Sequence, residues 1–174
     1  METHLRPIER AGCDMINPAL FSSATDDWAT PQQLFDNLDY VFNFTLDACA
    51  SDENHKCPKY FTAKDDGLIQ DWGGNKVFCN PPYGRDTTGA WIKKCYEESK
   101  KPGTVVVALV PSRTDTKWFQ QYIYQTNAEV FFIKGRLKFG DGQNSAPFPS
   151  MIVIFGFYWM YLNTSWKNEI LKEN

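Results

Sequence analysis

The segment Asn80-Pro81-Pro82-Tyr83 carries the residues of this sequence that are best suited to chemistry. It closes the apolar run 76–80, which we expect to be a strand. Two adjacent prolines donate no backbone hydrogen bonds and hold a stiff, extended turn, so their carbonyl oxygens can face a ligand. The side-chain oxygen of Asn80 is a further acceptor. Together with the Pro81 carbonyl oxygen, it can accept both hydrogens of an exocyclic amino group.

An exocyclic amino group is a poor nucleophile, because its lone pair is delocalised into the ring. Two acceptors outside the ring plane favour a pyramidal nitrogen, whose lone pair can attack a methyl group in line. Positioning and preorganised dipoles would supply most of the catalysis. Tyr83 offers a ring face for base stacking, worth about 1–3 kcal/mol per base. A base in duplex DNA must be flipped out to reach such a pocket. The alternative is an ordinary turn at the end of a strand.

The elements around this turn predict an α/β fold. The predicted helices span 30–38, 88–100 and 115–124. The predicted strands span 42–49, 76–80, 104–110, 128–133 and 151–162, the last as one or two strands. This alternation indicates a mainly parallel sheet with flanking helices, in which ligands bind at the carboxyl ends of the strands. Asp47 and Asn80 are both expected at such ends.

The chain is expected to form one domain over 26–163, with a loose arm at 1–25 and a tail at 164–174. The net charge of −3 argues against a strongly basic nucleic-acid coat protein, but a local basic groove stays compatible with it. The apolar run at 151–162 is too short to cross a bilayer, and no secretory signal is visible, so we expect no membrane association and a cytoplasmic location.

The five cysteines are dispersed without a C-x-x-C pair, which is typical of reduced thiols in a cytosolic protein. Cys49, His55 and Cys57 match no usual zinc spacing, so no metal site is expected.

The Asn80–Tyr83 motif, directly behind a strand, resembles motif IV of amino-methyltransferases that use S-adenosyl-L-methionine. The whole chain resembles the phage-type DNA adenine methyltransferase (Dam-like) family. The matching segments, in the order of the family, are DDWATPQQLFDNL (26–38), FTLDACAS (44–51), CPKYFTAKDDGLIQDW (57–72), FCNPPYGR (78–85) and GRLKFGDGQNSAPFPSMIVIF (135–155). The resemblance implies a Rossmann-like methyltransferase fold, S-adenosyl-L-methionine as cofactor and DNA as partner. The implied reaction is methylation of the 6-amino group of adenine, in the host cytoplasm if a phage encodes the chain.

The resemblance also assigns roles to the segment Trp28–Pro31, which would approach the methionine end of the cofactor. Thr30 would hydrogen-bond the cofactor carboxylate, Trp28 would pack beside it, and Pro31 would complete the segment. The alternative for Thr30 and Pro31 is a simple helix start, with Thr30 as the cap.

Four acidic or small residues and Asn80 complete the cofactor site that the resemblance implies. Asp47 matches the acidic residue of motif I and would face the cofactor ammonium group, with Ala48 beside it. Asp65 or Asp66 would receive the amino group of the cofactor adenine, and Asp66 is favoured. The segment 48–51 departs from the usual pattern, because motif I commonly carries glycines there and this chain has none.

The side chains expected to bind DNA are Arg85, Arg113, Arg136, Lys138 and Phe139, while Lys93, Lys94 and Lys117 are further cations near strand ends or on helices. A charged, solvated face is the alternative for each cation. The glycine-rich loop 135–150 is expected to contribute to substrate binding. Because no separate target-recognition domain is visible, we expect a relaxed or short recognition site, or recognition by a dimer.

Other readings of the same chemistry stay open at this point. The acceptor geometry also suits the 4-amino group of cytosine or the side-chain amide of a protein glutamine. A non-catalytic nucleic-acid-binding module on the same fold is a third alternative. The sequence leaves open the recognition site, the preference for duplex or single strand, and the oligomeric state.

Overall fold

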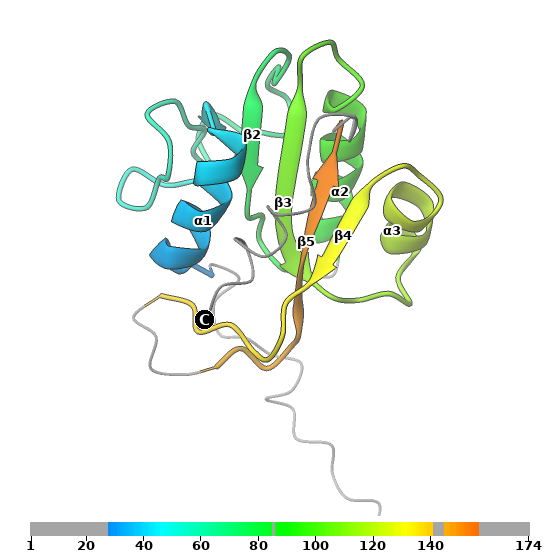
Figure 1. The fold of residues 1–174 in the computed structure, drawn as a ribbon. Helices are drawn as coiled ribbons and strands as arrows, with labels where there is room; N and C mark the ends of the chain where they lie inside the picture. Colours follow the sequence, from blue (N-terminus) through cyan, green and yellow to red (C-terminus); the bar gives the residue numbers. More distant parts are fainter. Residues whose placement is uncertain (1–27, 85, 141–144, 157–174) are drawn as a thin grey trace, which may run out of the picture.

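The computed structural model describes residues 28–84, 86–140 and 145–156. Its helices are α1 (Gln32–Phe42), α2 (Thr87–Glu98) and α3 (Lys117–Phe119), and α3 continues into a π-helical segment, Gln120–Tyr124 (Figure 1). Its strands are β1 (Leu46–Asp47), β2 (Lys76–Cys79), β3 (Val105–Pro111), β4 (Glu129–Phe132) and β5 (Ser150–Phe155). The predicted α/β architecture is therefore confirmed.

The five strands form one mixed sheet in the order β1-β2-β3-β5-β4. β1, β2 and β3 pair in parallel, with Phe78 opposite Val107, whereas β5 is antiparallel to both β3 and β4. The predicted parallel pairing thus holds for the first three strands only. The described parts of the connection from β4 to β5, residues 133–140 and 145–149, contain no crossover helix, and β5 enters the sheet from the end at which β4 stops.

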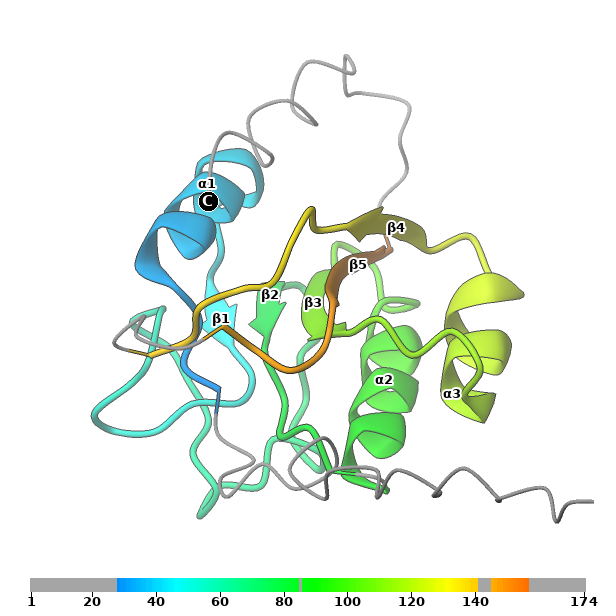
Figure 2. The same ribbon diagram turned by 90° about the horizontal axis from the view of Figure 1, so that it is seen from below.

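Helices cover both faces of the sheet, with α1 on one side and α2 and α3 on the other (Figure 2). β3 contributes to both cores, because successive side chains of a strand point to opposite faces. Val107 and Leu109 pack in the core beneath α1, whereas Val106 and Ala108 pack in the core beneath α2 and α3. This double burial explains why β3 is an almost unbroken apolar run.

The first helix is longer than predicted, and the following strand is shorter. α1 continues to Phe42 and ends at Asn43, which adopts the left-handed conformation with φ 52°. The Asp39 carboxylate then accepts the Phe44 backbone N–H at 2.7 Å. Asparagine tolerates this conformation better than most residues. The alternating residues 42–45 therefore belong to a helix end and a turn rather than to β1.

The predicted arm at 1–25 and tail at 164–174 lie outside the described residues, as does Arg85. The second half of the apolar run 151–162 also lies outside them, so β5 is the strand that can be compared there. None of the described helices combines the length and apolarity needed to cross a bilayer.

Candidate active site

A cavity of about 630 Å³ opens where β1 and β2 end. Its walls come from the segment before α1, the loop after β1, the turn at 66–67, the turn after β2, and α2. The lining residues are Trp28, Ala29, Ala48–Asn54, Phe61–Lys64, Asp66, Gly67, Asn80–Pro82 and Trp91. The predicted ligand position at the carboxyl ends of the parallel strands therefore coincides with a real cavity.

Asp47, at the tip of β1, is buried, with 3% of its surface exposed, and does not line this cavity. Its carboxylate accepts the backbone N–H of Lys56 at 2.9 Å and that of Cys49 at 3.4 Å. Burial raises the pKa of Asp47 above its ordinary value, against the lowering effect of these two bonds. Asp47 thus holds the loop 48–56 that forms the cavity wall, a role that its sequence position did not suggest. Its direct contact with a cofactor stays a prediction.

The loop that replaces a glycine-rich motif I keeps an ordinary backbone. Ala48–Ser51 line the cavity, and the non-glycine residues with positive φ in the described part of the chain are Asn43 and Asp66. The Ala48 N–H donates to the Phe78 carbonyl oxygen at 2.9 Å, which ties the tip of β1 to β2. Because this path needs no left-handed residue, alanine, cysteine and serine can follow it.

Of the two adjacent aspartates, Asp66 lines the cavity and Asp65 does not. The Asp65 carboxylate accepts the Thr62 N–H at 2.8 Å and the Thr62 hydroxyl at 2.7 Å, and these bonds lower its pKa. Asp66 has φ 51°, and its Oδ1 accepts the Leu68 N–H at 3.2 Å. This turn presents Asp66 to the cavity, and the contact of Asp66 with the cofactor adenine stays a prediction.

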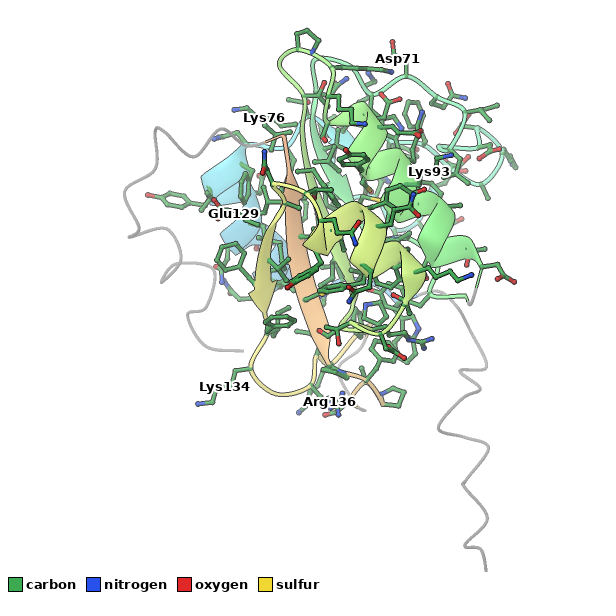
Figure 3. All side chains as sticks on the ribbon, turned by 90° about the vertical axis from the view of Figure 1, so that its right-hand side faces the viewer. Asp71, Lys76, Lys93, Glu129, Lys134 and Arg136 are labelled. Atoms are coloured by element: carbon green, nitrogen blue, oxygen red, sulfur yellow. The ribbon has the colours of Figure 1, made fainter. Side chains whose placement is uncertain are left out.

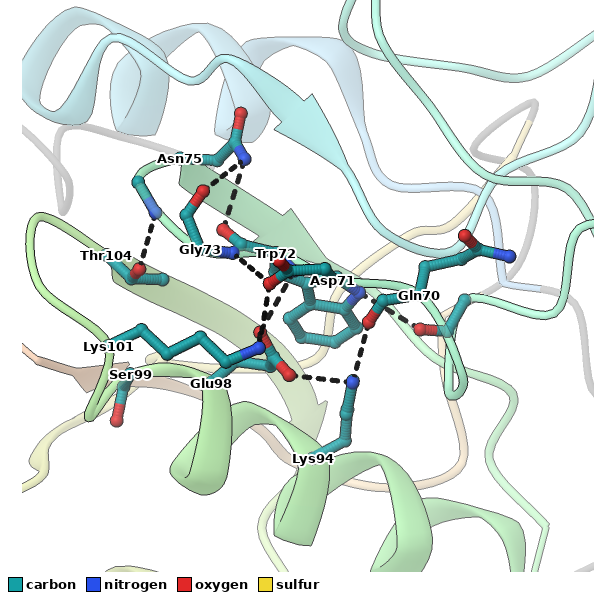
Figure 4. Close-up of polar contacts among 12 residues, drawn as sticks. Gln70, Asp71, Trp72, Gly73, Asn75, Lys94, Glu98, Ser99, Lys101 and Thr104 are labelled. Carbon is teal, nitrogen blue, oxygen red and sulfur yellow. Dashed lines mark hydrogen bonds and ion pairs between the residues drawn. The ribbon is translucent and has the colours of Figure 1, made fainter.

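An ionic network centred on the buried Glu98 carboxylate fixes the segment 66–76 against α2 (Figure 4). Glu98 is 4% exposed and accepts the Trp72 N–H at 2.9 Å, while Lys94 and Lys101 donate to it at 2.7 and 2.6 Å. Burial raises the pKa of Glu98, but the bonds from Lys101, Lys94 and Trp72 outweigh burial and lower the pKa below its ordinary value. The Trp72 indole then donates to the Gly67 carbonyl oxygen at 3.0 Å. The network therefore supports the turn that carries Asp66.

Asn80 stands at the carboxyl end of β2 and reaches the segment before α1. Its Nδ2 donates to the Trp28 carbonyl oxygen and, at 2.9 Å, to Thr30 Oγ1. The Thr30 side chain makes no capping hydrogen bond to α1, whose N-cap residue is Pro31. The structure thus brings the predicted Trp28–Pro31 segment to the predicted turn after β2, and it gives Thr30 a partner that sequence reasoning missed.

The two prolines present their carbonyl oxygens differently. The Pro82 carbonyl oxygen accepts the Thr88 hydroxyl at 3.2 Å. Pro81 is buried and lines the cavity, and within the described ranges no donor reaches its carbonyl oxygen. The Pro81 oxygen is therefore the one that stays available to a ligand.

Tyr83 is buried, with 6% of its surface exposed, and does not line the cavity. Its hydroxyl donates to Asn80 Oδ1 at 2.6 Å. Its ring makes T-shaped contacts with Phe139 and Phe148 at centroid distances of 6.1 and 5.4 Å. In this arrangement, the ring faces that the sequence suggested for base stacking are covered by protein.

The described residues of the connection between β4 and β5, 133–140 and 145–149, pack against the segment before α1. Trp28 packs edge-on against Phe139 and Phe148, each at a centroid distance of 5.2 Å, and the Gly140 N–H donates to the Ala29 carbonyl oxygen at 2.9 Å. Phe139 is only 7% exposed. The expectation that Phe139 contacts DNA does not fit this burial, because its ring instead anchors the loop to the segment before α1.

The basic residues that the sequence predicted to bind DNA differ in solvent exposure and in ion pairing. Arg113, Lys117, Arg136 and Lys138 are exposed. Lys93 is exposed beside Glu97, with 3.7 Å between their charged groups. Lys94 is only 15% exposed and is bound to Glu98, so it serves the fold instead. Arg136 lies with Lys134 at the end of the sheet opposite to Asp71 and Lys76 (Figure 3).

The charges around the cavity favour a cationic ligand. Of the described residues, Asp52, Glu53 and Asp66 line the cavity, and Lys64 is the one cation that does. Such a wall attracts an ammonium or sulfonium group and disfavours a phosphate. Among the residues that the structure describes, no three His, Cys, Asp or Glu side chains are grouped to hold a metal ion.

Comparisons with known proteins agree with this chemistry. Residues 18–168 match the family described as DNA N-6-adenine-methyltransferase (Dam). A DNA N-6-adenine-methyltransferase of Haemophilus phage HP1 is 31% identical over 142 residues, which are 76% of this chain and 80% of the relative. A protein of the same name from Escherichia phage T1 is 33% identical over 114 residues, which are 64% of this chain and 46% of the relative. A putative methyltransferase, YfdM of Escherichia coli K12, is 37% identical over 65 residues, which are 33% of this chain and 71% of that protein.

The family match spans most of the chain, from before α1 to beyond β5, and contains every element of the site described above. It confirms the family that the sequence motifs predicted. The chain belongs to the phage-type DNA N-6-adenine-methyltransferase (Dam) family.

Proposed function

We propose that this chain transfers a methyl group from S-adenosyl-L-methionine to the 6-amino group of adenine in DNA. The observation that carries the proposal is the position of Asn80 and Pro81 on the wall of a cavity of about 630 Å³ with acidic lining residues. A cavity of this size suits a small-molecule cofactor. The names of the relatives support adenine as the target base.

The cofactor would lie against the acidic side of the cavity. S-adenosyl-L-methionine supplies an electrophilic methyl group on a positively charged sulfur, and its amino group is a second cation. Asp52 and Glu53 suit these charges, and Asp66, which also lines the cavity, would accept the amino group of the cofactor adenine. Trp28 and Thr30 lie beside Asn80, so the methionine end of the cofactor would lie next to the reacting base.

The flipped target base would enter beside Asn80. Asn80 Oδ1 and the Pro81 carbonyl oxygen would accept the two hydrogens of its amino group and aim the nitrogen lone pair at the methyl group. The cofactor would supply its methyl group to this nitrogen and leave as S-adenosyl-L-homocysteine, and the proton lost by the nitrogen would pass to water. The two acceptors contribute mainly by orienting the amino group.

The DNA would approach the carboxyl edge of the sheet. Arg113, Arg136 and Lys138 are exposed near this edge and would contact phosphates. Flipping the target base out of the duplex would then bring its amino group to Asn80. Arg85 remains a candidate from the sequence alone.

We also propose that the mixed five-stranded sheet is a Rossmann-like methyltransferase fold. The cavity lies at the carboxyl ends of β1 and β2, two of the three strands that pair in parallel, and helices cover both faces of the sheet. The relatives from two phages further support a role in modifying phage DNA in the host cytoplasm, which would protect that DNA from restriction.

The test is incubation with isotopically labelled S-adenosyl-L-methionine and unmethylated DNA, followed by mass analysis of the nucleosides. Labelled N6-methyladenine is the expected product. Label on the 4-amino group of cytosine would show that cytosine, not adenine, is the target base. Label on protein glutamine would show that the substrate is a protein rather than DNA. S-adenosyl-L-methionine at 100 times its Kd should stabilise the protein by about 2.7 kcal/mol, whereas a chain that the cofactor stabilises at no concentration is a binding module rather than an enzyme.

A further inference from the structure

We propose that Tyr83 and Thr30 are positioning residues for Asn80. Their hydroxyl groups, together with the Trp28 carbonyl oxygen, would fix the orientation of the Asn80 amide before a base enters the site. We call these three groups the amide clamp. The inference rests on the proposed function, in which Asn80 Oδ1 accepts a hydrogen of the target amino group.

The partners of Asn80 determine which end of its amide faces which side. The Trp28 carbonyl oxygen can only accept a hydrogen bond, so it must face the NH₂ end. Thr30 Oγ1 lies 2.9 Å from the same nitrogen and accepts its second hydrogen. With both hydrogens engaged, Oδ1 must point to the other side, where the Tyr83 hydroxyl donates to it at 2.6 Å.

The Tyr83 hydroxyl is a well-held donor. Its single hydrogen lies between Asn80 Oδ1 at 2.6 Å and the Leu109 carbonyl oxygen at 3.2 Å, and the shorter contact takes the larger share. Phe139 and Phe148 pack edge-on against the ring and limit its movement. Burial raises the pKa of Tyr83 well above its ordinary value, so the hydroxyl stays protonated and continues to donate.

The clamp leaves the amide oxygen half occupied. An amide oxygen accepts two hydrogen bonds, and Tyr83 uses one of these positions. The remaining position can accept one hydrogen of the target amino group, while the Pro81 carbonyl oxygen accepts the other. A complete acceptor pair is thereby in place without any movement of Asn80.

Orientation matters because the two ends of an asparagine amide have nearly the same shape. An amide turned by about 180° would present its NH₂ group to the target amino group, and two donors would then face each other. A free asparagine side chain would sample both orientations. Fixing the productive one in advance is the kind of preorganisation that raises kcat rather than substrate affinity.

This role of Tyr83 differs from that of a stacking platform, and the two make opposite predictions for one substitution. Phenylalanine keeps the ring and removes the hydroxyl. If Tyr83 acts only through its ring, Tyr83→Phe transfers methyl groups at the wild-type rate. If the hydroxyl orients Asn80, the same variant is slow.

The experiment compares Tyr83→Phe, Thr30→Val and Thr30→Ser with the wild type, and it uses Tyr40→Phe as a matched control. Tyr40 is 79% exposed on α1, so its variant loses a hydroxyl away from the site. We expect Tyr83→Phe and Thr30→Val to lower kcat by about tenfold or more, because the acceptor is no longer preorganised. The KM for DNA should change by no more than about twofold in both variants, and the Kd for S-adenosyl-L-methionine should change by no more than about twofold in Tyr83→Phe. Thr30→Ser restores a hydroxyl and should recover most of the rate.

A second readout is independent of activity. The two Nδ2 hydrogens of Asn80 give side-chain ¹⁵N–¹H NMR signals, which are assigned by their loss in Asn80→Ala. In the unliganded wild type they should exchange slowly, because both are hydrogen-bonded. They should shift and exchange faster in Thr30→Val, and they should also shift in Tyr83→Phe.

Wild-type kcat in Tyr83→Phe, or Asn80 signals that do not change in either variant, would overturn the clamp. A wild-type protein that methylates no adenine would instead overturn the proposed function. In that case the NMR signals alone decide whether the amide clamp exists, so the two failures are distinguishable.

Discussion

Gly67 lies so close to Ala48 that a Cβ atom on Gly67 would stand 2.3 Å from the Ala48 carbonyl oxygen. The same atom would stand 2.9 Å from the Trp91 ring. This contact joins the turn that carries Asp66 to the tip of β1, and both line the cavity. The absence of a side chain at Gly67 therefore sets the distance between two walls of the proposed cofactor site.

Gly67→Ala should push these two walls apart. We expect a loss of about 1–3 kcal/mol in the free energy of unfolding, which is typical of an overpacked interior, and a lower affinity for S-adenosyl-L-methionine in calorimetry. Gly89→Ala in α2 is the matched control, because its Cβ would make an ordinary contact of 3.4 Å with Trp118. Equal cofactor affinity in the two variants would show that the close approach does not shape the site.

Glu98→Gln should weaken the network that holds segment 66–76. A hydrogen bond to a charged group contributes about 1.5–3 kcal/mol, so we expect a loss of about 2 kcal/mol in the free energy of unfolding at pH 7. Urea denaturation measures it. Glu97→Gln is the control on the same helix, because Glu97 is half exposed, lies 3.7 Å from Lys93, and should change stability by less than about 1 kcal/mol.

The effect of Glu98 should also depend on pH. Its pKa is lowered in the folded protein relative to an ordinary value of 4.5, so the ionised carboxylate stabilises the fold above that value. This contribution is lost as the pH falls through the lower, folded pKa. The stability difference between the wild type and Glu98→Gln should therefore shrink below about pH 4.5. A difference that stays constant down to pH 3 would show that the charge of Glu98 is not what stabilises the network.

Arg136→Ala should weaken DNA binding without altering cofactor affinity. If Arg136 contacts one phosphate, the slope of log K against log salt concentration should fall by about 1 in magnitude. Lys76→Ala is the control, because Lys76 is an exposed cation at the opposite end of the sheet (Figure 3). Fluorescence anisotropy at several salt concentrations measures both. Equal slopes in the two variants would place the DNA elsewhere.

Much of the fold follows from local patterns in the sequence. The continuous apolar run of β3 predicted that strand within one or two residues, and the short apolar run that ends at Asn80 predicted β2 equally well. The cavity position followed from strand ends, because parallel strands collect their carboxyl ends on one edge. The antiparallel entry of β5 could not be predicted, because a long loop carries no signal for the end of the sheet at which the next strand begins.

The roles of single side chains were harder to predict, because they depend on contacts between distant segments. Tyr83 and Phe139 read as exposed ligand contacts, but each ring packs against the other across 56 residues of sequence. Asp47 read as a ligand contact, whereas its carboxylate holds backbone N–H groups of the loop 48–56. A buried strand end with a carboxylate followed by a long polar loop is a weak signal for such a role.

The acceptor role of Asn80 is the central claim, and Asn80→Ala tests it most directly. Single-turnover methyl transfer to unmethylated DNA and calorimetric binding of S-adenosyl-L-methionine should be measured on the same variant, with Asn127→Ala, an exposed asparagine, as control. We predict a loss of about 100-fold or more in the rate of N6-methyladenine formation, since one preorganised polar group contributes about that much. Cofactor affinity should stay within about threefold of the wild type, because the proposed contact of Asn80 Oδ1 is with the target base rather than with the cofactor. An Asn80→Ala protein that methylates adenine at the wild-type rate would contradict the account.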